Sequence, residues 1–254
     1  HFCAVNRTGL KKFGYDASSE DPSGGIIRRR DGGREPNGVL EELAAFPKFL
    51  PVITPSGPEN TDYFMRKGTE LAKSFGYTTA HEGRAFANTH ESLAAYASKG
   101  GFDIDVLSYI DYTNIDLMGS EWNSRDYKNH YRIAGVKITL DGSPQGRTAW
   151  RTKPYLLPPD GQKEGYMGYP AIAKDGIVAR VFERAYENKW QVIAHANGDA
   201  AVDQLIRAVR SAHEKHGPGD RRHTLIHGQF VRLDQLDALK ELQIIPSLFP
   251  MHTF

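Results

Sequence analysis

The apolar positions divide the chain into two unlike parts. After Asn60, segments with apolar residues at helical spacing alternate with short runs of β-branched and apolar residues. Residues 1–60 show no such alternation and are rich in glycine and proline, as in DPSGGIIRRRDGGREPNGV and PVITPSGPEN. A period of about 3.6 residues indicates an amphipathic helix, and a short apolar run bounded by turns is typical of a buried strand. We therefore expect an irregular segment over 1–60 and a regular succession of helices and strands after it.

Five helices are expected in the second part. The first begins near Thr61 and ends at Gly76, and four others cover residues 88–100, 175–189, 199–217 and 232–243. Asp199 is expected to cap the helix over 199–217, because an aspartate oxygen accepts hydrogen bonds from the free N–H groups of a first turn. The expected core positions of the first helix are Phe64, Met65, Leu71, Ala72 and Phe75.

Six strands are expected beside these helices. They are YTTAH (77–81), DIDVLSYIDY (103–112), RIAGVKITLDG (132–142), WQVIAH (190–195), HTLIH (223–227) and IIPSLF (244–249). Strands with nearly continuous apolar cores that alternate with helices form a parallel sheet covered by helices. The pattern therefore predicts an α/β fold, and a length of 254 residues is ordinary for an α/β barrel.

Residues 142–175 interrupt the alternation with a segment rich in glycine, proline and tyrosine. Long loops inside compact domains are often functional. We interpret this segment as a lid-like insertion over the barrel mouth, with Tyr155, Tyr166 and Tyr169 available to line a site. The alternative is that these tyrosines are only exposed loop aromatics.

Composition narrows the function classes. The chain has 32 basic and 31 acidic residues and a net charge of +1, so nothing in its charge favours binding of nucleic acid or of an anionic membrane. No apolar run has the length of a membrane span. The single cysteine, Cys3, excludes an internal disulfide and fits a reducing compartment, and we expect a cytoplasmic protein. A homo-oligomer is compatible with this composition.

Histidines stand at the ends of several expected strands. His81, His195 and His227 each end one, and His252 follows the last. In a parallel barrel the functional groups lie at the carboxyl ends of the strands. Imidazoles that converge from different strands are suited to a divalent transition metal.

Each of these residues also has a plainer interpretation. A single strand-end histidine is more often a hydrogen-bonded residue of the barrel edge, and Lys137 within a strand is more often a side chain that reaches out to solvent. His90, His130, His213 and His216 are interpreted as solvated. The occurrence of Lys137, His195 and His227 on successive strands is what favours a metal site.

Three motifs in this order carry a family resemblance: GVKITLDGSPQGRTAW, VIAHANGDAAVDQLIRA and RRHTLIHGQ. Together they resemble the amidohydrolase superfamily, and within it amidohydrolase family 3, the branch of YtcJ-like proteins and N-substituted formamide deformylase. The opening segments HFCAVNRTGL and GGIIRRRDGGREPNGVL are also similar to that branch. The resemblance implies a (β/α)8 TIM-type barrel domain over 1–254. It also implies metal-dependent hydrolysis of a C–N bond in a small, non-peptide amide.

The resemblance further implies the site. Lys137 would be a carboxylated lysine that binds metal together with His195 and His227, and the metal would be one or two divalent ions, most readily zinc. A buried lysine loses its charge readily, and the neutral amine can take up carbon dioxide to form an anionic carbamate. Arg147 falls at an arginine of the family pattern and is a candidate for substrate binding. Further candidates for substrate binding are His81, Tyr169 and His252.

The chain also departs from the family pattern. The first-strand His-x-His pair would precede His1, the last-strand Asp would follow Phe254, and Ile226 stands where the family commonly has Glu. We expect an internal piece of a longer protein, with six of eight strands, lacking the small flanking β domain and inactive by itself. Two functions stay open: a metal-dependent amide hydrolase, and a catalytically inactive relative with a binding or regulatory role.

Overall fold

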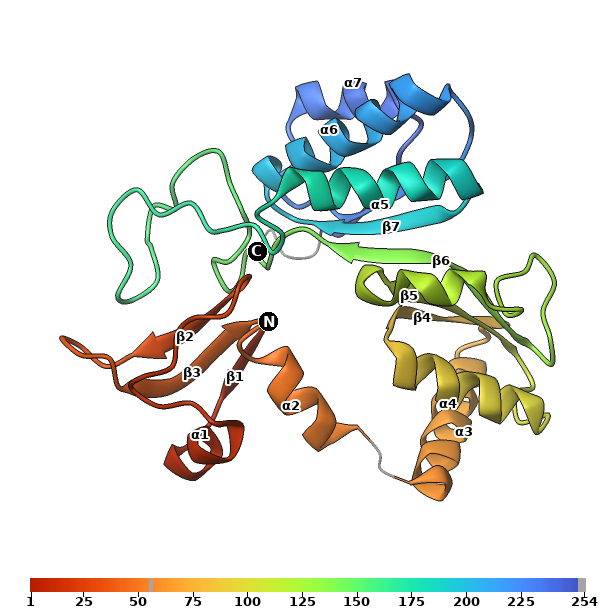
Figure 1. Ribbon diagram of the computed structural model, residues 1–254, viewed down its shortest axis with the longest axis horizontal. Helices are drawn as coiled ribbons and strands as arrows, with labels where there is room; N and C mark the ends of the chain where they lie inside the picture. Colours follow the sequence, from red (N-terminus) through yellow and green to blue (C-terminus); the bar gives the residue numbers. More distant parts are fainter. Residues whose placement is uncertain (55–56, 251–254) are drawn as a thin grey trace.

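The computed structural model describes residues 1–54 and 57–250, and it contains two separate sheets (Figure 1). The smaller sheet is antiparallel, with strand order β1-β3-β2. Its strands are β1 (Phe2–Ala4), β2 (Gly25–Arg29) and β3 (Pro36–Glu42). Helix α1 (Arg7–Phe13) lies between β1 and β2 in the chain, and helix α2 (Phe46–Ile53) follows β3.

The expectation of an irregular segment over 1–60 is therefore wrong. The small sheet has its own core, in which Leu10 of α1 packs with Ile27 and Leu40. Strand β1 contributes no buried residue, and β2 and β3 contribute only a few, with charged neighbours such as Arg28 and Glu41 beside them. Such short strands between glycine-rich turns leave too little periodicity to be detected in the sequence.

The larger sheet consists of six parallel strands in sequential order, β4 to β9. The strands are β4 (Thr79–Ala85), β5 (Asp105–Asp111), β6 (Tyr131–Thr139), β7 (Gln191–Ala196), β8 (Thr224–His227) and β9 (Ile245–Leu248). The helices are α3 (Pro58–Ser74), α4 (Ala87–Ser98), the 3-10 helix η1 (Tyr112–Gly119), α5 (Asp175–Asn188), α6 (Asp199–His216) and α7 (Leu233–Glu241). The sheet curls into a half-barrel (Figure 1), so the α/β prediction with six parallel strands is confirmed, while the described residues do not close an eight-stranded barrel.

Side-chain alternation gives the sheet two different faces. On the outer face, Val192 and Leu225 are fully buried beneath helical residues such as Phe182 of α5 and Leu205 of α6. On the inner face, Leu107, Tyr109 and Ile193 form a smaller cluster. Burial of the outer face against the helices supplies most of the apolar contact that holds the half-barrel together.

Helix α3 differs from its predicted packing. Phe64, Leu71 and Phe75 were expected in the core, but they are 63%, 60% and 71% exposed. Met65 does pack against a cluster formed by α4 and its neighbours. Amphipathic spacing identifies residues that favour burial, but it does not identify what covers them.

The segment over 142–175 is irregular, as expected, and it is attached to the small sheet. Arg28 of β2 donates a hydrogen bond to the carbonyl of Asp160 at 2.7 Å. The hydroxyl of Tyr169 donates to Glu41 of β3 at 3.2 Å. The segment thus connects the carboxyl end of β6 with the small sheet, and its role as a lid stays a prediction.

Among the described residues, no helix combines the length and apolar character needed to cross a bilayer.

Candidate metal centre

Polar side chains gather where β5, β6, β7 and β8 end. The ladder pairs Asp111 of β5 with Lys137 of β6, and Thr139 of β6 with His195 of β7. Neighbours paired in a parallel ladder point to the same face of the sheet. Together with His227 of β8 and Asp141 just after β6, these residues form what we call the strand-end cluster: Asp111, Lys137, Asp141, His195 and His227.

His195 is the most enclosed imidazole of the cluster. It is 6% exposed, and its Nε2 donates a hydrogen bond to the carbonyl of Gly142 at 2.8 Å. Burial, and after it the positive charge of Lys137, lowers the pKa of His195 well below its ordinary value. The ring is therefore neutral near pH 7 and, with Nε2 protonated, carries its lone pair on Nδ1.

His227 reaches the same place through an unusual backbone conformation. Its ladder partner is Ala196, which belongs to the outer core, so simple alternation would turn His227 outward as well. Instead His227 has a φ of 78°, in the left-handed region, and its ring lies edge-on to His195 with centroids 4.7 Å apart. Non-glycine residues in this region cost free energy and concentrate at functional sites. The backbone at the end of β8 thus turns the imidazole toward His195.

Lys137 is 8% exposed within β6. Burial, and then the nearby guanidinium of Arg84, lowers the pKa of Lys137 to about 8, while Asp111 acts in the opposite direction. Arg84 itself donates to Asp111 at 2.8 Å. The uncharged form of Lys137, which can accept carbon dioxide, is consequently a minor fraction at pH 7 that grows as the pH approaches 8.

Asp141 fixes the loops that carry His195 and its surroundings. Its carboxylate accepts backbone N–H bonds from Trp150 at 2.9 Å, from Asn197 at 2.8 Å and from Gly198 at 2.7 Å. Complete burial raises the pKa of Asp141 to about 7 in spite of these three donors. Gly198 cannot be replaced easily, because a Cβ there would lie 1.8 Å from the carbonyl oxygen of Trp150.

Sequence reasoning missed two residues beside this cluster, His1 and Glu42. The ring of His1 lies 5.6 Å from that of His195, and its Nδ1 lies 2.9 Å from both carboxylate oxygens of Glu42. The hydrogen bond to Glu42 raises the pKa of His1. Glu42 is 6% exposed, has a φ of 46°, and accepts a hydrogen bond from Thr148 at 2.6 Å. The sequence signal for Glu42 is the adjacent pair Glu41–Glu42 after an apolar stretch, but this pair lies in a segment whose pattern predicts irregular structure.

The other predicted residues lie elsewhere or have different contacts. His81 was expected to end its strand, but β4 runs on to Ala85, so His81 is an exposed residue near the start of that strand. Arg147 donates to the carbonyl of Pro158 within the segment over 142–175, at 3.2 Å. Tyr169 contacts Glu41, and His252 lies outside the described residues. Their roles in substrate binding stay predictions.

Comparison with known proteins decides the family. The model of the amidohydrolase family matches residues 1–254. The chain belongs to the amidohydrolase family. It is 25% identical to YtcJ of Bacillus subtilis (strain 168) over 258 residues, which cover 98% of this chain and 46% of the relative. It is also 25% identical to LONG AFTER FAR-RED 3 of Arabidopsis thaliana over 264 residues, covering 99% of this chain and 44% of that protein.

Solved structures agree with the amidohydrolase fold. An uncharacterised metal-dependent hydrolase from Pyrococcus horikoshii OT3 superposes with a TM-score of 0.70 at 23% identity, over 98% of this chain and 46% of the other. A similar protein from Pyrococcus furiosus gives 0.69 at 21% identity, over 97% of this chain and 47% of the other. The amidohydrolase chain thus spans about half the length of the relatives it matches.

The strand-end cluster of this amidohydrolase fits a divalent metal in its donor chemistry. His195 is held neutral by burial, as a metal ligand must be, and His227 adjoins it. Lys137 is the third group near His195, and its depressed pKa increases the fraction of uncharged amine. Two neutral imidazoles suit zinc and similar ions, and a third donor from this position would complete such a set.

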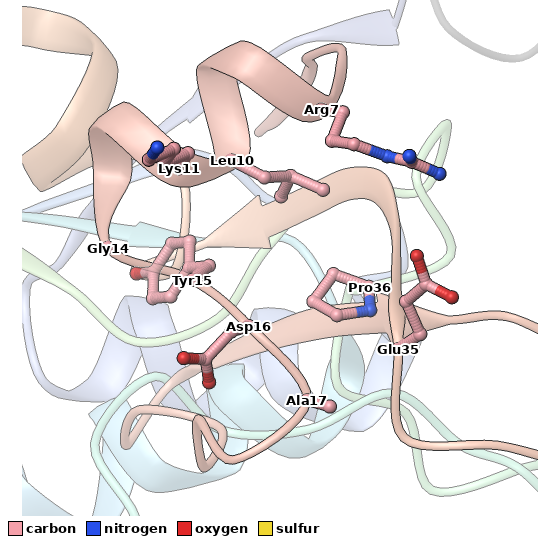
Figure 2. Close-up of a pocket in the computed structure, with 9 residues that line it drawn as sticks. All are labelled: Arg7, Leu10, Lys11, Gly14, Tyr15, Asp16, Ala17, Glu35 and Pro36. Carbon is pink, nitrogen blue, oxygen red and sulfur yellow. The ribbon is translucent and has the colours of Figure 1, made fainter.

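A separate cavity lies on the small sheet of the amidohydrolase. Figure 2 shows this cavity, of about 310 Å³, beside α1 and the residues that precede β3. Arg7 and Lys11 lie on one side of it, and Asp16 and Glu35 also line it. None of its lining residues belongs to the strand-end cluster, so we assign it no part in the chemistry.

Proposed function

We propose that the protein is a metal-dependent amidohydrolase that cleaves the C–N bond of a small, non-peptide amide. The observation that carries this proposal is the neutral, buried His195 in edge contact with His227, with Lys137 beside it at the carboxyl end of a parallel sheet. Membership of the amidohydrolase family supports the same reaction class.

Three residues would hold the metal, and zinc suits them best. His195 and His227 supply neutral nitrogen, and Lys137, carboxylated by carbon dioxide, supplies anionic oxygen. When bound, a divalent metal supplies a strong nucleophile from water at neutral pH and polarises the substrate carbonyl. The nearby carboxyl groups of Asp141 and Glu42 would, in their ionised form, offset part of the positive charge of the ion.

Other residues of this chain position the site. Asp141 holds the turn after β7 through two backbone N–H groups, and so sets the direction in which His195 points. The segment over 142–175 leaves β6 at the same edge of the sheet, which supports a role for Arg147 and Tyr169 in binding the substrate. His81 and His252 are further candidates for substrate binding that rest on the sequence pattern alone.

The test is hydrolysis by the purified complete protein. A panel of formamides, other N-substituted amides, cyclic amides and dipeptides is assayed after removal of metal with a chelator and after readdition of Zn²⁺. We expect turnover of at least one non-peptide amide, lost on chelation and restored by the metal. Absence of metal-dependent turnover across the panel, in a protein that still binds metal, would instead favour the inactive relative with a binding role.

A further inference from the structure

A second group of metal-ligating side chains lies between the ends of two helices. Glu183 and Glu187 are one turn apart near the end of α5, and His216 is the last residue of α6. The ligand atoms of these three side chains all lie within 4.8 Å of one another. Donor atoms about 2.1 Å from a common ion are about 3 to 4 Å apart, so small side-chain rotations would bring these three atoms onto one shared cation.

This group is remote from the strand-end cluster. Helix α5 ends at Asn188, just before β7 begins at Gln191, and α6 ends at His216, before β8 begins at Thr224. The group therefore lies at the amino ends of the strands, whereas His195 and His227 lie at their carboxyl ends. In barrels of this kind the amino-terminal face serves stability rather than catalysis.

The imidazole of His216 provides an independent observation. Its Nε2 is buried, and within the described part of the chain it has no hydrogen-bond partner. The ring packs beside Tyr186, with centroids 6.3 Å apart. His216 as a whole is half-buried, so the interpretation of it as solvated does not hold for its Nε2. A buried polar atom without a partner costs about 1 to 3 kcal/mol and calls for an explanation such as an ion.

The neighbouring charges limit which ions could bind. Lys215 forms an ion pair with Oε1 of Glu183, which keeps that glutamate ionised and leaves its second oxygen for another ligand role. The guanidinium of Arg221 lies over the ring of Tyr186 at 3.8 Å. Lys215 offsets the charge of Glu183, so a weakly held monovalent ion gains little here. An ion that forms directional bonds with imidazole nitrogen and carboxylate oxygen is favoured.

We propose that Glu183, Glu187 and His216 bind one divalent transition-metal ion, of the Zn²⁺ class, that joins the end of α5 to the end of α6. A cation at this place also interacts favourably with the carbonyl-rich ends of both helices. Helices α5 and α6 cover the outer core of β6 and β7, which includes Phe182 and Leu205. The ion would therefore stabilise the packing of the half-barrel and take no part in catalysis.

The experiment uses the complete protein with His195→Ala and His227→Ala, so that the strand-end cluster no longer contributes. Zn²⁺ alone is the probe, in equilibrium dialysis and in thermal unfolding followed by circular dichroism. We expect about one Zn²⁺ per chain and a rise in Tm when the metal is added. Glu187→Gln and His216→Gln, each made in this background, should remove both the bound equivalent and the rise in Tm.

Matched controls come from the same helix. His213→Gln and Glu214→Gln lie on α6 outside the three-residue group, and each should leave binding and the Tm response unchanged. Because Glu187 is exposed, Glu187→Gln tests the site without disturbing the core. The proposal is overturned if the background protein binds no Zn²⁺, or if Glu187→Gln and His216→Gln bind as much as the two controls. The proposal does not depend on amide hydrolysis, so it can fail while the proposed function holds.

Discussion

His223, which directly precedes β8, should make the protein less stable in mild acid. His223 is 3% exposed, and its Nδ1 accepts the backbone N–H of Val192 at 3.1 Å. Its ring packs against Phe182 and Tyr186, with centroids 5.3 and 5.4 Å away. Burial lowers the pKa of His223 from 6.5 to about 4.

The sign of the effect follows from proton uptake. Between pH 6.5 and pH 4 the unfolded chain binds a proton at His223 that the folded chain does not bind, so stability falls as the pH falls. Between pH 7 and pH 5 this one residue should reduce the free energy of unfolding by about 2 kcal/mol. Urea unfolding of the protein at the two pH values measures the change.

The variant His223→Asn isolates this contribution. The side-chain oxygen of asparagine can still accept the N–H of Val192, and asparagine does not titrate. The variant loses ring packing equally at both pH values, so its stability should fall by about 2 kcal/mol less than that of the wild type on going from pH 7 to pH 5. Equal falls in both proteins would refute the inference that a neutral, buried His223 supports the fold.

Three further predictions concern the strand-end cluster and the helix that follows β8. Asp141→Asn should destabilise the protein by about 2 to 4 kcal/mol in urea unfolding, because an amide cannot accept all three backbone N–H bonds; an unchanged midpoint would contradict this. Lys137→Ala should abolish hydrolysis, and added acetate or propionate should restore part of it by replacing the carbamate oxygens; failure of every short carboxylate would argue against a carboxylated lysine. Arg232→Gln should cost about 1 kcal/mol by removing ion pairs to Asp199 and Asp203, which thermal unfolding at low and high salt can measure.

The parallel sheet could be predicted because a local sequence pattern marks each of its strands. Segments such as WQVIAH are apolar on both faces, and the helices between them have regular spacing. The convergence of His195 and His227 followed from topology, since parallel strands end at the same edge. The conformation that turns His227 inward could not be predicted, because alternation along β8 implies the opposite direction.

The small sheet and its contribution to the site could not be predicted from the sequence. Glu42 lies beside Thr148 across 106 positions of the chain, and such a contact has no local signature. His90 shows the same limit, since it was expected to be solvated but is buried with its Nδ1 2.9 Å from the hydroxyl of Tyr131. Local sequence patterns identify helices and strands, whereas contacts between distant segments of the chain determine which polar residues are buried.

Metal content tests the central claim most directly. The complete protein, His195→Ala, His227→Ala and the control His81→Ala are each dialysed against Zn²⁺ in a Glu187→Gln background, which removes the proposed helix-end site. Elemental analysis should then find at least one Zn²⁺ per chain in the parent and in His81→Ala, and a large loss in His195→Ala and in His227→Ala. Full metal content in either strand-end variant would contradict the assignment of that histidine as a ligand.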